Sequence, residues 1–175
     1  MTECSNREEQ KILLELSENW QKEKLKIFFE NYNPKISDID LAIRKCINKF
    51  KKHNINHDET LKELFKHADI NYCNPDFDSS NILMLICSKC EMYLFDLLCE
   101  QKYLNNNDKN KTNKQNNKNN NKENNIYSEI DLCKSDKNNS NVFHYLLQNK
   151  SIDNGINEFI SKIMNYFLYN SLFLK

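Results

Sequence analysis

Glycine and proline are scarce in this chain, which has 175 residues but a single glycine, Gly155, and only two prolines, Pro34 and Pro75. Tight β-hairpins usually need glycine at their turns, so a meander of antiparallel strands is not expected. Phosphate-binding loops need glycine as well, and the sequence contains no Gly-rich cradle for a nucleotide. The turns must therefore use other residues, and asparagine, which tolerates left-handed backbone geometry, is abundant.

An excess of charge of either sign is also missing. The chain carries 25 basic and 25 acidic side chains, so its formal net charge is zero. The densest basic stretch, residues 44–53, reads RKCINKFKKH and has acidic residues on either side. We interpret it as a solvated helix face, because a nucleic-acid footprint needs a larger basic excess. No nucleic-acid partner is expected.

Long hydrophobic runs are absent too. The first ten residues, MTECSNREEQ, lack the basic start and apolar core of a signal peptide. The apolar segment at residues 163–174 is interrupted by polar residues and is shorter than the roughly 20 residues that cross a bilayer. We therefore expect an intracellular protein, cytoplasmic or nuclear, with no membrane partner. Its seven cysteines are then interpreted as reduced thiols rather than a disulfide framework.

Asparagine is concentrated between residues 105 and 125. Twelve of these 21 residues are Asn, and none is apolar. Such a segment cannot bury enough surface to offset the entropy lost on ordering it, so it predicts a disordered insertion. Its role stays open between a tolerated expansion without function and a polyvalent Asn-rich contact.

The remainder of the sequence predicts helices. A capping box at residues 5–8 precedes the first helix, and Pro34 follows its end. Ser37 and Asp58 are expected to cap the second and third helices. A helix–loop–helix unit that returns at a spacing of roughly 30 residues indicates a repeat architecture. Apolar spacing places the helices at residues 6–32, 38–52, from 58 onward, 80–89, 91–103, 141–149 and 156–170.

Two stretches that follow one another resemble ankyrin repeats. Residues 64–71, LFKHADIN, resemble the end of one repeat, where an outer helix runs into a Gly-Ala-Asp-Val-Asn signature. Residues 76–100, DFDSSNILMLICSKCEMYLFDLLCE, then follow the body of the next repeat without a gap. In this alignment residues 81–84, NILM, stand where the family has Thr-Pro-Leu-His.

A second repeat body resembles the same family from Asp136 onward. Asp76 and Asp136 both align with the Asp of the family's finger loop, the turn that precedes each inner helix. His67, Ser79, Cys90 and Asn139 all align with positions where the family has glycine, and these substitutions are departures from the family pattern.

His144 lies in an apolar run, and the residues alone leave it open as a base, a metal ligand or a structural group. Within the stretch NVFH, Asn141 to His144 align with the family's Thr-Pro-Leu-His. The resemblance implies that Asn141 caps the helix and that His144 is a buried, hydrogen-bonded framework residue.

The resemblance covers roughly residues 38–104 and 126–167. It implies an all-α fold, a short ankyrin-like helical repeat solenoid with an N-terminal helical cap and a disordered Asn/Lys-rich loop. The chain departs from the family in lacking both helix-start prolines and the turn glycines, and in the extra stretch SIDNG. The expected divisions are 1–57 (capping helices), 58–104 (ankyrin-like repeats), 105–125 (insertion) and 126–175 (terminal repeat and C-terminal helix).

Cys87 and Cys90 form a C-x-x-C pair, which admits three interpretations. A thiol-redox site would need a lowered thiol pKa, and a zinc site would need further ligands, for which Cys73, Cys99 or the His53/His57 pair are candidates. The third interpretation is that both are small hydrophobic residues in helix packing. Hydrolase, P-loop and zinc-protease motifs are absent, so we expect no catalytic residues, cofactor or metal.

The resemblance implies a protein–protein interaction module, such as an adaptor, scaffold or assembly factor. Its partner, another protein, would bind the concave face formed by finger loops and inner helices. Leu85 and Tyr145 would form an exposed hot-spot pair, unless a different helix rotation or the N-terminal helices cover them in part. Further repeats outside this chain are a second open possibility. The predicted contact residues are Tyr72, Phe77, Leu85, Lys89, Lys137, Tyr145 and Gln148.

Overall fold

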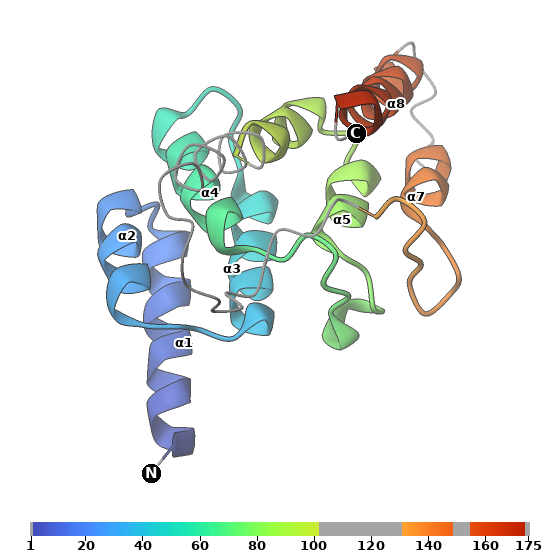
Figure 1. Cartoon of the computed structure of the whole chain (residues 1–175). Coiled ribbons are helices and arrows are strands. Elements are labelled where there is room, and N and C mark those ends of the chain that lie inside the picture. The colour runs from blue at the N-terminus through green and yellow to red at the C-terminus, as the bar shows by residue number, and fades with distance from the viewer. Residues whose placement is uncertain (1, 102–130, 149–154, 174–175) are drawn as a thin grey trace, which may run out of the picture.

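The computed structural model describes residues 2–101, 131–148 and 155–173, and side chains within residues 6–101, 131–148 and 156–165 (Figure 1). Within these residues the regular elements are helices, and the only extended pairing is a bridge between Asn74 and Ser80. The predicted all-α class is thereby confirmed. Residues 92–101 are also helical. The labelled elements are α1 (Thr2–Glu18), α2 (Lys22–Asn31), α3 (Ile36–Lys49), α4 (Ile55–His67), the 3-10 turn η1 (Pro75–Phe77), α5 (Ile82–Ser88), α7 (Val142–Gln148) and α8 (Gly155–Phe173).

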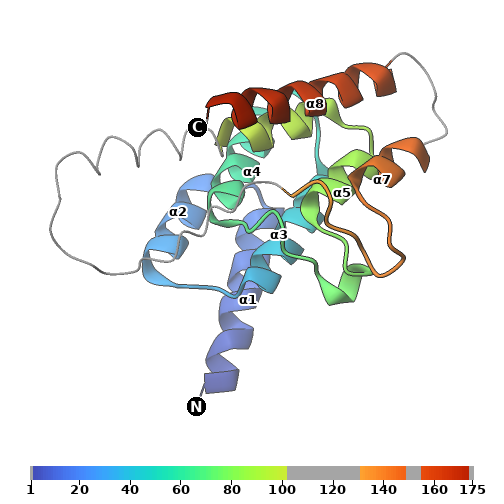
Figure 2. The same cartoon turned by 45° about the vertical axis from the view of Figure 1, so that its right-hand side comes forward.

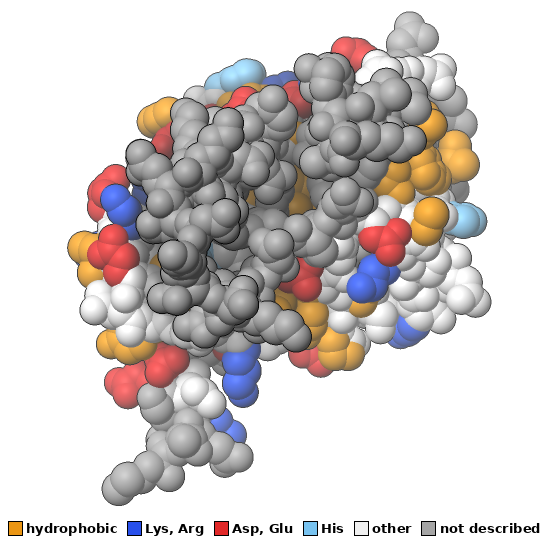
Figure 3. All heavy atoms as spheres, viewed as in Figure 1, with side chains coloured by type: hydrophobic (Ala, Val, Ile, Leu, Met, Phe, Trp, Pro, Cys, Tyr) orange, Lys and Arg blue, Asp and Glu red, His pale blue; other side chains and the backbone are white. Residues whose placement is uncertain are grey.

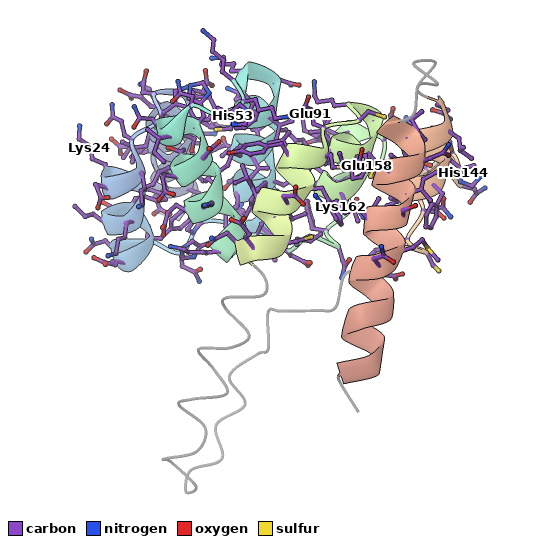
Figure 4. The ribbon with its side chains drawn as sticks, turned by 90° about the horizontal axis from the view of Figure 1, so that it is seen from above. Lys24, His53, Glu91, His144, Glu158 and Lys162 are labelled. Atoms are coloured by element: carbon purple, nitrogen blue, oxygen red, sulfur yellow. The ribbon has the colours of Figure 1, made fainter. Side chains whose placement is uncertain are left out.

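The helices lie in two layers. In one layer α1 packs on α3, α3 on α5, and α5 on α7. In the other, α2 packs on α4, and Figure 4 shows the helix at 92–101 and then α8 continuing the row. The layers are joined by contacts of α1 with α2, α3 with α4, and α7 with α8. Figure 2 shows α8 lying above α5 and α7.

One continuous hydrophobic core runs between the two layers. We call the layer of α1, α3, α5 and α7 the inner layer and the other the outer layer. Each inner-layer helix contributes a fully buried side chain; these are Leu13, Ile43, Leu83 and Leu146. In the outer layer, the Phe95 ring packs edge-on against the ring of Phe159, with centroids 5.5 Å apart. Burying each such side chain contributes about 1.5–3 kcal/mol, so the core is the main source of stability.

The hydrophobic core continues across the boundary that was expected between residues 57 and 58. This boundary lies inside α4, and both His57 and Asp58 are buried. α3 and α4 pack as a pair across this boundary. Residues 105–125 and parts of the segment 126–175 lie outside the described residues.

The single N-terminal helix predicted at residues 6–32 is instead two helices. α1 ends because Trp20 takes left-handed backbone geometry, with φ of 56°, and the Gln21 N–H donates to the Leu16 carbonyl at 3.0 Å. This bonding pattern closes many helices, usually with glycine at the left-handed position. Because tryptophan occupies the left-handed position in this chain, the sequence does not indicate the end of α1.

Two of the expected helix caps at the N-terminal end are also wrong. α1 begins at Thr2, so Ser5 lies inside the helix rather than at its start. α3 begins at Ile36, one residue before Ser37, and its N-cap residue Lys35 makes no side-chain hydrogen bond. Helix starts without a side-chain cap leave no local mark in a sequence.

The third expected cap is displaced by four residues. α4 is capped by Asn54, whose side-chain oxygen accepts from the backbone N–H groups of Asn56 and His57 at 3.1 and 3.4 Å. Asp58 lies inside the helix, where its carboxylate accepts a hydrogen bond from the Tyr93 hydroxyl at 2.6 Å. That bond also ties α4 to the helix at 92–101.

Candidate functional site

Two loops, each preceding an inner helix, form the centre of the candidate site. In the first, residues 74–80, the Asn74 N–H donates to the Ser80 carbonyl at 3.1 Å and closes the loop. The Asn74 side-chain oxygen accepts from the Asp76 N–H at 3.0 Å. Asp78 and Ser79 both have left-handed backbone geometry. We call this segment the first finger loop.

The second finger loop, residues 136–140, closes in the same way. The Asp136 N–H donates to the Ser140 carbonyl at 2.9 Å, and the Asp136 side chain accepts from the N–H groups of Asn138 and Ser140, both at 2.8 Å. Asn74, rather than Asp76, therefore performs in the first loop what Asp136 performs in the second. The expected equivalence of Asp76 and Asp136 is wrong because the first loop is two residues longer.

Three of the four residues that the resemblance aligned with family glycines have positive φ angles, whereas His67, at the end of α4, does not. These angles are 57° at Ser79, 51° at Cys90 and 59° at Asn139. Positive φ angles are energetically unfavourable for non-glycine residues, and less so for asparagine than for serine or cysteine. The turn positions are therefore left-handed although the sequence supplies no glycine there.

Asparagine side chains cap both inner helices that follow the finger loops. Asn81 accepts from the Met84 N–H at 2.9 Å at the start of α5. Asn141 accepts from the N–H groups of Phe143 and His144 at 3.2 and 3.3 Å at the start of α7. Asn141 thus caps α7.

His144 is hydrogen-bonded as predicted but is exposed rather than buried. Its Nδ1 lies within hydrogen-bonding distance of both the Asn141 backbone nitrogen (3.2 Å) and the Asn141 Oδ1 (2.7 Å). Met84, in the same position of α5, is fully buried because α7 packs against α5. No element among the described residues covers the outer side of α7, and Figure 4 shows His144 at the end of the molecule opposite Lys24.

A buried polar network fixes the first finger loop to α3. Arg44 donates to the Asp40 carboxylate at 2.7 Å and to the Ser80 carbonyl at 2.6 Å. Asn74 donates to the same Asp40 carboxylate at 2.6 Å. The Arg44 guanidinium also lies 4.5 Å from the centre of the Phe77 ring. Arg44 is thus buried, which corrects its interpretation as part of a solvated basic face.

Two contacts hold the second finger loop. The Tyr145 hydroxyl donates to the Asp136 carboxylate at 2.7 Å. Burial and this hydrogen bond raise the pKa of Tyr145 to about 12. The Lys137 N–H donates to the Asp78 carbonyl at 2.9 Å, and the two side chains form an ion pair. The second contact joins the two finger loops into one surface.

The predicted contact residues divide into a half-buried group and an exposed group. Leu85 and Tyr145 are half-buried and pack against the core, so the expected exposed pair is partly covered, as the alternative allowed. Phe77 keeps 36% of its surface exposed. Hydrophobic side chains and charges of both signs lie interspersed on the described part of the face in Figure 3. Of the remaining residues, Tyr72 is half-buried, whereas Lys89, Lys137 and Gln148 are exposed.

Sequence reasoning missed two residues of this surface region. Arg44 holds the first finger loop from another helix, and its only local signal is the spacing of four residues from Asp40. Leu147, on the outer side of α7, is 68% exposed. It occupies the position of Cys87 in α5, so its exposure reflects the end of the row of helices rather than a pattern in the sequence.

The C-x-x-C pair lies at the end of α5. Cys87 is fully buried in the core, and burial raises the pKa of its thiol well above the usual range. That shift disfavours the thiolate that redox chemistry and zinc binding both need. Within the described part of the chain, no three His, Cys, Asp or Glu side chains are grouped so as to hold a metal ion.

No family model, no curated protein and no solved structure matches the chain. Among the described residues, none of the helices is both long and apolar enough to cross a membrane.

Proposed function

We propose that the chain is a short ankyrin-like solenoid that binds another protein. Three features support the repeat architecture: helices in two rows, finger loops closed by the same hydrogen bonds, and asparagine caps at matching places. The left-handed turns at Ser79, Cys90 and Asn139, where the family has glycine, are a fourth supporting feature. Stacked units of this kind bury one another's apolar faces and present loops along one edge.

The observation that carries the binding proposal is the link between the two finger loops. Arg44 holds the first loop from inside, and the Asp78–Lys137 contacts join it to the second. A partner would therefore meet a surface that is already ordered, and it would lose little entropy on binding. Phe77 and Lys137 supply the aromatic and charged side chains that such surfaces commonly use.

The proposed activity is binding rather than catalysis, and the proposed setting is the interior of a cell. Cys46 and Cys87 are free thiols in the core, which fits a reducing compartment. The alternative of a zinc or thiol-redox protein is not favoured, because Cys87 is buried and its thiol pKa is raised.

A pair of matched variants tests the proposal. Phe77→Asp with Lys137→Glu alters the finger loops, whereas Ile27→Asp with Lys24→Glu makes the same charge changes on α2, where Ile27 is 58% exposed. Circular dichroism first establishes that both variants fold. In affinity capture from native extract, a partner of wild type should be lost with the finger-loop variant and kept with the α2 variant. Loss with both, loss with neither, or no partner would contradict the proposal.

A further inference from the structure

Trp20 and His57 form a close stack at the junction of α1, α2 and α4. Their ring centroids are 3.6 Å apart, and the rings are within 11° of parallel. Trp20 occupies the left-handed turn between α1 and α2, whereas His57 lies in the first turn of α4. The stack therefore attaches the α1–α2 turn to α4.

The imidazole of His57 is bonded in a way that requires a neutral ring. Its Nδ1 accepts a hydrogen bond from the Lys51 backbone N–H at 2.9 Å, and the side chain is buried. A proton on Nδ1 would remove this acceptor and place a charge in a buried position.

Each element packed against His57 contributes a defined group. The α1–α2 turn supplies the neutral Trp20 ring, and the segment after α3 supplies the Phe50 ring and Lys51. α4 supplies Asp58, whose carboxylate is engaged by the Tyr93 hydroxyl of the helix at 92–101. Burial and Lys51 lower the pKa of His57, while Asp58 acts in the opposite direction.

A second histidine stack lies at the other end of α4. His67 stacks on Phe29 of α2, with centroids 3.8 Å apart and 12° between the planes. Its Nε2 lies 3.6 Å from the Glu63 carboxylate. This second stack attaches α2 to the far end of α4 and involves neither Trp20 nor the α1–α2 turn.

We propose that His57 is an acid-sensitive latch, whose protonation releases Trp20 and the adjoining α1–α2 turn from α4 while the rest of the helices stay packed. α1 keeps its own contacts with α3, including the bond from Cys46 Sγ to the Ser17 carbonyl at 3.4 Å. α2 keeps the Phe29–His67 stack. The released part is therefore the turn around Trp20, and this inference does not depend on the proposed binding function.

The pH window follows from the direction of the shift. A released His57 has an ordinary pKa of about 6.5, and the latched ring has a lower one. The latch is at full strength above about pH 6.5 and weakens as the pH falls toward the latched pKa. Between the two values the released population rises by up to about tenfold per pH unit. Glu18 and Glu63 have pKa values of about 2, so their ion pairs persist through this window.

Trp20 is the only tryptophan in the chain, so tryptophan fluorescence reports on the surroundings of this residue. The experiment records tryptophan emission and acrylamide quenching of the full chain from about pH 8 to about pH 4.5, together with far-ultraviolet circular dichroism. We expect Trp20 to become accessible to acrylamide below about pH 6.5, without loss of the helical signal. His57→Phe, which keeps an aromatic ring for the stack, should abolish the transition, and the control His67→Gln should retain it.

The latch is refuted if the transition persists in His57→Phe, coincides with loss of helix, or is absent from wild type. Nitrogen-15 NMR of the histidine rings in wild type provides a second test that needs no variant. It should show an unprotonated Nδ1 on His57 and a pKa below about 6.5. A His57 pKa at or above that value would overturn the inference even if His57→Phe failed to fold.

Discussion

Arg44 and Ser80 are joined by two hydrogen bonds between α3 and the first finger loop. The guanidinium donates to the Ser80 carbonyl at 2.6 Å and to its hydroxyl at 3.3 Å. Because the carbonyl belongs to the residue that closes the loop, the position of the loop depends on a buried side chain of another helix. The finger loop is therefore part of the folded core and not a separate surface feature.

Arg44→Leu should destabilise the protein strongly. The substitution leaves the Asp40 carboxylate buried without its cation, and breaking a buried pair in this way costs about 3–5 kcal/mol. Urea unfolding followed by circular dichroism measures the change. Arg44→Lys keeps the charge but loses the two-point contact with Ser80, so it should fall between wild type and Arg44→Leu. A loss below about 1 kcal/mol for Arg44→Leu would contradict the role given to the network.

Asn81→Ala should cost about 1 kcal/mol, because it removes the cap of α5. Asn81→Ser is the informative comparison. Serine keeps an oxygen for the Met84 N–H and removes the buried Asn81 amide nitrogen, which has no hydrogen-bond partner among the described atoms. Thermal and urea unfolding should rank Asn81→Ser above Asn81→Ala. Equal stability of the two variants would show that the cap contributes little.

Tyr145→Phe should lower stability by about 1.5 kcal/mol, since a hydrogen bond to a charged carboxylate is lost. It should also raise the pKa of Asp136. Burial raises that pKa, but hydrogen bonds from Ser140, Tyr145 and Asn138 hold it below its ordinary value. Carbon-detected NMR titration of the carboxylate gives the pKa directly. An unchanged Asp136 pKa would mean that Tyr145 does not hold the second finger loop.

Glu63→Gln should remove part of the acid sensitivity of the fold. Hydrogen bonds with His67 and Lys66 lower the pKa of Glu63 from 4.5 to about 2, although burial opposes the shift. Its contribution is thus present above about pH 4.5 and is lost as the pH falls toward 2. Urea unfolding above and below this window should show a smaller fall in stability for Glu63→Gln than for wild type. Parallel losses in both proteins would contradict the assignment.

Local signals predicted the parts of the molecule that depend on local bonds. The helices near residues 80–89 and 141–149 begin where asparagine offers a capping oxygen, and their apolar spacing marks the buried side. The capping role of Asn141 and the hydrogen bonding of His144 were implied by the resemblance of that stretch to the family motif. Each of these interactions spans only a few residues, so the sequence displays it.

Features that join distant segments left little or no trace in the sequence. Arg44 lies in a basic stretch, and only the loop far along the chain makes it a buried residue. The break at Trp20 lacked its usual glycine. His144 was expected to be buried because the resemblance aligned it with a framework histidine, but its exposure depends on whether another element packs on that side of α7.

The most direct test of the account replaces Phe77 of the full chain with a photo-crosslinking phenylalanine analogue. The same analogue at Ile27 of α2, which is 58% exposed, serves as the control, and both proteins are irradiated in native extract. We expect a covalent adduct with another protein from position 77 and none from position 27. Adducts from position 27 alone, equal adducts from both, or none from either would contradict the proposal that the finger loops bind a protein partner.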